Sequence, residues 1–193
     1  MKYLVVGLGN IGSEYESTRH NAGFAVVDRL ADELGGTFVS DRYASVVELK
    51  FKGRTLVVIK PSTYMNLSGK AVRYWLDKEN IQKENLLVVS DDIAIPLGTL
   101  RIRSKGSDGG HNGLKNIDQL TGGGDYARIR MGMGSDFPQG HQIDFVLSRL
   151  SPDEQKLFST AAAEAVEAIK AFCTIGIDRT MNTFNHHNPK AAQ

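Results

Sequence analysis

The chain has 193 residues and a formal net charge of +1, a length that suits one domain with a sizeable core. This charge balance excludes a protein coated in basic residues, although it is compatible with a local basic patch. The single cysteine, Cys173, excludes an internal disulfide. No apolar run is long enough to span a membrane, and no leader precedes the first predicted strand. We therefore expect a cytoplasmic protein.

Apolar strand-like runs and helical periods alternate along the chain. In chain order they predict strand 2–6, helix 21–34, strands 43–51 and 55–60, helix 69–79, strands 86–90 and 99–103, helix 113–120, strand 127–133, and a long helix from 152 to about 173. Ser151 and Pro152 are typical of a helix N-terminus. The sequence thus predicts a single α/β domain at 1–185, with a twisted, mixed, mostly parallel sheet flanked by helices, and a flexible C-terminal tail at 186–193.

A glycine-rich loop follows the first predicted strand, where open α/β sheets bind ligands. Its residues 7–12 match the dinucleotide pattern G-x-G-x-x-G. A dinucleotide site would need a helix to open at the third glycine, Gly12, but the helical period begins only near Asn21. The acid about twenty residues further on, Asp28, falls inside that helix instead of ending a second strand. These positions argue against an NAD-dependent oxidoreductase.

Polar residues gather directly after several predicted strands. They are Asn10 with His20, the run 61–69, the pair Asp91-Asp92, and the run 109–113. Loops at one sheet edge can converge, so we expect these four groups to form one site.

His20 is the natural general base, because histidine titrates at about 6.5, close to working pH. A carboxylate bound to its other ring nitrogen would fix the tautomer. Asp91 is the preferred partner and Asp92 the competing one. A histidine taken alone is more often a solvated loop residue, but the adjacent glycine turn favours a functional role.

Three asparagines, Asn10, Asn66 and Asn112, can donate hydrogen bonds to a peptide or to a developing oxyanion. Helix capping is a serious alternative for Asn66 and Asn112, which lie near predicted helix starts.

Basic residues share faces of two strands: Arg101, Arg103 and Lys105 on one, Arg128 and Arg130 on another. Phosphate binding and a solvated sheet face are equally compatible with this spacing.

Other chemistries lack their motifs. The sequence contains no G-x-S-x-G elbow, no Walker A loop, no H-E-x-x-H and no paired cysteines. We therefore expect attack by water, without a metal or cofactor. The pair His186-His187 is interpreted as part of the tail.

Taken together, these motifs resemble the bacterial peptidyl-tRNA hydrolase family. The matching parts, in family-like order and spacing, are 7–12, Tyr15, 18–23, 61–69, Asp91-Asp92 with Pro96 and Gly98, 109–114, and 128–134. The resemblance implies a monomeric enzyme that cleaves the ester between a peptide and the 3′ ribose of tRNA, and so recycles tRNA. Its partner would be the acceptor stem and 3′ end of peptidyl-tRNA.

The resemblance also implies residue roles. His20 matches the base that activates water, Asp91 the carboxylate that orients it, and Asn10 the residue that discriminates blocked from free aminoacyl groups. The remaining matches contact the substrate or tRNA: Tyr15 and Tyr64 line the site, Asn66 and Asn112 hold the substrate near the ester, His111 lies near the acceptor end, and Arg103 and Arg130 clamp the 5′ phosphate.

The chain departs from the family pattern at Ala94, where a second acid is common, and at Ser135-Asp136, where a basic residue and proline are common. These departures concern tRNA contacts more than the chemistry. The alternative function is that of a non-catalytic RNA-binding protein of the same fold. The joint presence of Asn10, His20 and Asp91 argues against it.

Overall fold

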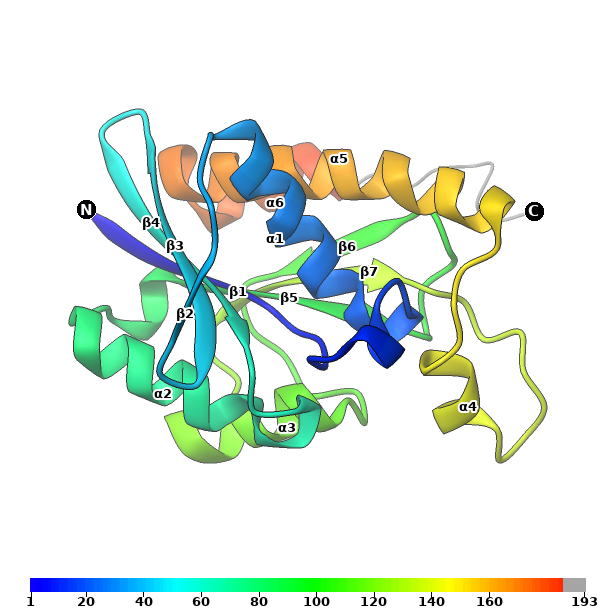
Figure 1. The fold of residues 1–193 in the computed structure, drawn as a ribbon. Coiled ribbons are helices and arrows are strands. Elements are labelled where there is room, and N and C mark those ends of the chain that lie inside the picture. Colours follow the sequence, from blue (N-terminus) through cyan, green and yellow to red (C-terminus); the bar gives the residue numbers. More distant parts are fainter. Residues whose placement is uncertain (186–193) are drawn as a thin grey trace.

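Seven strands form one mixed sheet in the order β2-β3-β4-β1-β5-β7-β6 in the computed structural model, which describes residues 1–185 (Figure 1). The four central strands are parallel, and antiparallel pairs close both edges. The strands are β1 (Lys2–Gly7), β2 (Val39–Asp41), β3 (Ala44–Phe51), β4 (Arg54–Pro61), β5 (Leu86–Asp92), β6 (Leu100–Arg103) and β7 (Ala127–Gly132). The predicted α/β fold with a mostly parallel sheet is confirmed.

Helices cover both faces of this sheet (Figure 1). Helices α1 (Ala22–Glu33), α5 (Pro152–Ile175) and α6 (Ile177–Phe184) pack on one face, and α2 (Ser68–Glu79) and α3 (Asn112–Thr121) pack on the other. The short α4 (Gln142–Val146) lies apart from both layers. Single 3-10 turns are η1 (Ser13–Tyr15), η2 (Arg19–Asn21), η3 (Met65–Leu67) and η4 (Lys83–Asn85).

The continuous apolar runs are explained by this layering. In β1, Tyr3 and Val5 enter the core under α1 and α5, whereas Leu4 and Val6 enter the core over α2 and α3. Successive side chains of a strand point to opposite faces, so a strand covered on both sides must be apolar throughout.

The predicted elements all occur, with small shifts at their ends. The long helix begins as expected, and Ser151 and Glu154 form a reciprocal capping box. Three further elements, β2, α4 and α6, were not predicted from the sequence. The exposed β2 has only three residues and α4 only five, too few to show a period. The predicted tail at 186–193, with His186 and His187, lies outside the described residues.

The start of α1 lies directly on the ends of two strands. A Cβ built on Gly23 would be 2.3 Å from the Leu8 nitrogen and 2.4 Å from the Val89 oxygen. A Cβ on Gly7 would be 2.3 Å from the Gly23 oxygen. Only glycine permits this approach of backbone to backbone, which brings η2 over the carboxyl ends of β1 and β5. None of the helices within residues 1–185 has the length and apolar character needed to cross a membrane.

We predict that Gly23→Ala destabilises the fold although alanine favours helices. The new methyl group meets backbone atoms that cannot rotate away, so the free energy of unfolding should fall by about 3 kcal/mol, more than the helix propensity gained. Urea denaturation measures this loss. Ala25→Ser, at an exposed position of the same helix, is the control and should change stability by less than about 0.5 kcal/mol. Equal stability of the two variants would contradict the packing argument.

Candidate active site

All four polar groups of the sequence analysis meet at one cavity of about 380 Å³ at the carboxyl ends of the parallel strands. The loop after β1 contributes Asn10, Tyr15 and His20, and the loop after β4 contributes residues 64–66. The end of β5 contributes Asp91 and Asp92, and the glycine loop before α3 contributes residues 108–112. The expected convergence of the four groups is therefore confirmed by the fold.

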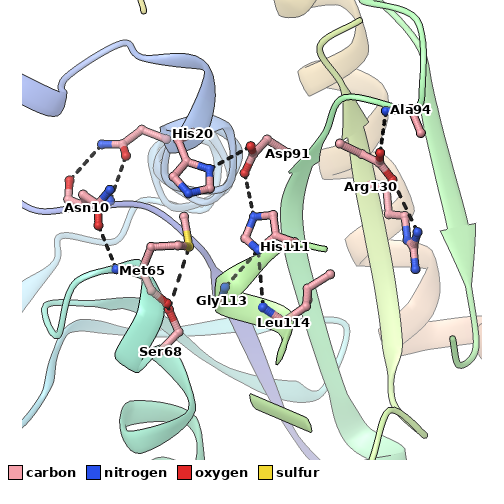
Figure 2. A network of polar contacts seen from close by, with 12 residues as sticks. Asn10, His20, Met65, Ser68, Asp91, Ala94, His111, Gly113, Leu114 and Arg130 are labelled. Atoms are coloured by element: carbon pink, nitrogen blue, oxygen red, sulfur yellow. Dashed lines mark hydrogen bonds and ion pairs between the residues drawn. The ribbon is translucent and has the colours of Figure 1, made fainter. Parts of the chain in front are cut away.

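Asp91 lies between two histidines at the centre of the site (Figure 2). Its Oδ2 is 2.8 Å from His20 Nδ1, and its Oδ1 is 2.8 Å from His111 Nε2. Only 3% of Asp91 is exposed, and a buried carboxylate needs such partners. Asp92, the competing candidate, instead accepts from the Ala94 amide at 2.8 Å and from Arg130 Nη1 at 3.4 Å. His20 is thus paired with Asp91.

The tautomer of His111 is set by the helix that it caps. Its Nδ1 accepts from the backbone amides of Gly113 at 3.1 Å and Leu114 at 3.3 Å, at the N-terminus of α3 (Figure 2). An imidazole nitrogen that accepts carries no proton, so the proton of His111 is on Nε2 and is donated to Asp91.

The hydrogen bonds in turn assign the proton of His20. Asp91, as a carboxylate, only accepts, so His20 Nδ1 donates to it and His20 Nε2 is unprotonated. That Nε2 makes no hydrogen bond within residues 1–185, and the residue lines the cavity. His20 therefore offers a lone pair to whatever the cavity holds.

The charge of Asp91 is kept by these contacts. Burial raises the pKa of its carboxyl, but the contacts with His111 and then with His20 outweigh burial and hold the pKa well below its usual range. The group is ionised at neutral pH.

Asn10 is oriented by three hydrogen bonds. Its Oδ1 accepts from the Met65 amide at 2.7 Å, and its backbone forms reciprocal bonds with the side chain of Asn21 at 2.8 and 2.9 Å. With Oδ1 occupied, Nδ2 is the free end of the amide, and it is a donor. The bond to Met65 adjoins Tyr64, whose φ of 60° is unfavourable for a bulky residue. Such local strain is common at functional sites.

Asn66 and Asn112 are exposed and line the same cavity. The side chain that caps α3 belongs to His111, and neither η3 nor α2 has a side-chain cap. Helix capping, the alternative considered for these asparagines, is therefore not what the structure shows.

The arginines of β6 and β7 lie beside the cavity, outside its walls. Arg101 is opposite Arg130 and Arg103 is opposite Arg128, so the four side chains share one face. Arg128 is fully buried and donates to the carbonyls of Ser107 and Gly124. Partial loss of hydration is the first cause that lowers the pKa of the exposed Arg103, and the charges of Arg101 and Arg130 add to it. Arg101, Arg103 and Arg130 thus form a cationic cluster next to the site.

The set His20, Asp91 and His111 has ligand atoms within 4.8 Å of one another, as a metal site would. The facing nitrogen of each histidine, however, carries a proton donated to Asp91. His111 cannot exchange tautomers without losing its bonds to the amides of α3. The arrangement is therefore better explained by two N–H groups that donate to one carboxylate than by three ligands of a metal ion.

Several residues of the site were missed from the sequence. Gln142, Ile143, Val146 and Leu147 form the outer wall of the cavity, but a five-residue helix shows no period. Asn21 belongs to the 18–23 motif, but no role was expected for it. Its position next to His20 on a short polar turn was the available signal.

Comparisons with known proteins agree over nearly the whole chain. The family model described as peptidyl-tRNA hydrolase matches residues 4–192. Proteins named peptidyl-tRNA hydrolase are 57% identical in Parabacteroides distasonis and 55% identical in Porphyromonas gingivalis, each match covering 96% of this chain and 100% of the relative. The crystal structure of peptidyl-tRNA hydrolase from Acinetobacter baumannii superposes with a TM-score of 0.91 at 34% identity, covering 97% of this chain and 96% of that one.

Proposed function

This chain belongs to the peptidyl-tRNA hydrolase family and hydrolyses peptidyl-tRNA, and we propose that His20 is the general base of the reaction. The observation that carries this proposal is the 2.8 Å bond between His20 Nδ1 and Asp91, which leaves Nε2 unprotonated at the cavity. The high identity to relatives named peptidyl-tRNA hydrolase, over nearly the whole chain, sets aside both the NAD-dependent and the non-catalytic interpretations.

In the proposed mechanism, His20 Nε2 takes a proton from water as the water oxygen attacks the ester carbonyl carbon. The negative charge of Asp91 stabilises the imidazolium that forms. Collapse of the tetrahedral intermediate breaks the bond to the 3′ oxygen of the ribose. That oxygen takes the proton back from His20, so the free base is restored and the products are a peptide acid and tRNA.

We assign His111 to holding Asp91, since both of its ring nitrogens are already used, one by Asp91 and one by α3. It also lines the cavity, which is compatible with the terminal nucleotide of tRNA lying beside its ring. Asn66, Asn112, Tyr15 and Tyr64 are proposed to hold the substrate around the scissile ester.

Asn10 is proposed to select blocked aminoacyl groups through its fixed donor. An N-acyl group offers a carbonyl oxygen to Nδ2, whereas a free α-ammonium offers only N–H donors. A donor facing donors loses its hydrogen bond and leaves polar groups unpaired, which discriminates strongly. The bond from the Met65 amide to Oδ1 supports this role, because it prevents the amide from rotating by half a turn to accept instead.

The cationic cluster of Arg101, Arg103 and Arg130 is proposed to bind the acceptor stem, with Arg103 and Arg130 on the 5′ phosphate. Its charge and its position next to the cavity suit a polyanion whose 3′ end enters the site. Arg103 is exposed, and Arg130 is held by the Ser107 carbonyl at 2.7 Å. We further propose that the protein works as a monomer in the cytoplasm, where peptidyl-tRNA arises.

We predict that His20→Asn lowers kcat by at least about 100-fold, the usual contribution of a general base, without weakening tRNA binding. Release of the acyl group from N-acetyl-aminoacyl-tRNA measures the first quantity, and a filter-binding Kd for uncharged tRNA measures the second. The wild type, assayed in parallel on aminoacyl-tRNA without the acetyl group, should leave that substrate intact. Retention of most of the turnover by the variant would remove His20 from the role of base.

We predict that Arg103→Ala weakens tRNA binding and reduces the slope of log Kd against log salt by about one unit, as expected for one lost phosphate contact. Binding titrations over a range of salt concentrations provide the slope. Lys50→Ala is the control, since this exposed lysine lies on β3 near the opposite edge of the sheet. Equal slopes in the wild type and Arg103→Ala would exclude Arg103 from the phosphate contact.

A further inference from the structure

The outer wall of the cavity is formed by a segment that lies outside the sheet and its two helical layers. We name residues 135–150 the covering segment; it contains α4 and contributes Gln142, Ile143, Val146 and Leu147 to the cavity. Ile143 is 73% exposed, and α4 lies away from the sheet and its two helical layers (Figure 1). Of the described elements, η2 contacts α4 most extensively, and Phe145 of α4 also packs against the core cluster beneath α1 and α5.

Arg19 of η2 forms most of this connection. Its backbone amide donates to the Ser148 carbonyl at 3.0 Å, and its Nη1 donates to the Arg149 carbonyl at 3.0 Å. Its guanidinium carbon lies 4.5 Å from the centre of the Phe145 ring. The neighbouring Thr18 forms an isolated β-bridge with Arg149. One buried side chain therefore contacts both α4 and the strand-like segment that follows it.

The same side chain is anchored at the start of α5. Arg19 Nη2 lies 3.1 and 3.0 Å from the two carboxylate oxygens of Glu154. Glu154 in turn accepts from the Ser151 amide at 2.9 Å in the capping box. Arginine is suited to this task because its planar guanidinium can stack flat on a ring while its edge donates to a carbonyl and, through a fixed fork, to a carboxylate. A lysine ammonium is a compact point charge without this plane.

The turn that holds Arg19 also holds the proposed base. Within η2, Arg19 contacts the covering segment, His20 contacts Asp91, and the Asn21 side chain holds the backbone of Asn10. Three consecutive residues thus join the outer wall, the base and the substrate-selecting amide. A displacement of the covering segment must be transmitted to this turn or must break the contacts of Arg19.

We propose that Arg19 is a positioning residue that couples the covering segment to His20, so that the base is aligned when the outer wall is in place. This inference rests on the proposed role of His20. Arg19 is not among the residues that line the cavity, and it acts through the placement of η2 and α4.

The test is Arg19→Lys, which keeps the positive charge but loses the planar, stacked guanidinium group. We expect kcat/KM on N-acetyl-aminoacyl-tRNA to fall by about 10-fold or more, since misplacement of a reacting group by about 1 Å is enough for this. Hydrogen exchange should become at least about 10-fold faster at the amides of residues 145–148 and stay unchanged in the middle of α5. The Kd for uncharged tRNA should not change, because the cationic cluster is untouched.

The matched control is Arg29→Lys. Like Arg19, Arg29 donates to α5, through the Ser159 carbonyl at 3.1 Å, but it belongs to α1 and, within the described residues, contacts neither η2 nor the covering segment. This variant should leave both measurements at wild-type values. Phe145→Leu is the second variant, because it removes the ring under Arg19 and keeps the pair with Glu154. It should accelerate exchange in 145–148 and lower kcat/KM even if Arg19→Lys fails to fold.

A coupling measurement separates positioning from general destabilisation. Ile143→Ala should lower kcat/KM in the wild type but have a clearly smaller effect in Arg19→Lys, because the wall is already displaced there. Full additivity of the two changes, or faster exchange with unchanged kcat/KM, would overturn the proposal. Failure of the His20 assignment would appear separately, as an active His20→Asn variant.

Discussion

A buried carboxylate that accepts two imidazole N–H groups is the interaction on which the site depends. Asp91 is ionised and almost without contact to solvent, so its charge must be satisfied by His20 and His111. The ring of His111 is held on its other side by backbone amides of α3, which donate to its Nδ1. The backbone amides of that helix therefore determine the tautomer of His111. Asp91 accepts from both rings, and His20 is left with the lone pair of its Nε2 at the cavity.

The sheet topology brings these groups together. Strands β1 and β5 are parallel neighbours, so the loop that carries His20 and the end of β5 that carries Asp91 emerge at the same edge. The contact between the backbones of Gly7 and Gly23 removes the space that side chains would need there. The turn η2 can then place Arg19, His20 and Asn21 against three different parts of the site.

The sequence predicted the fold and the residues around the cavity because both leave local signals. Doubly covered strands are apolar throughout, and polar groups such as Asn10, His20 and Asp91 follow them directly. What could not be predicted depends on contacts between distant residues. That Arg128 is buried on carbonyl groups while Arg103 is exposed, and that His111 caps α3 while it binds Asp91, follow from tertiary packing. The residues alone preferred Asp91 to Asp92 as the partner of His20, and the family resemblance chose between them. The outer wall at α4 was missed because five residues carry no period.

The proton positions of the two histidines test this account most directly. Imidazole nitrogen NMR at pH 8, where histidine is ordinarily neutral, distinguishes a protonated ring nitrogen from an unprotonated one. We predict opposite tautomers, with the proton on Nδ1 in His20 and on Nε2 in His111. A proton on Nε2 of His20 would leave no lone pair at the cavity and would contradict the central role given to Asp91.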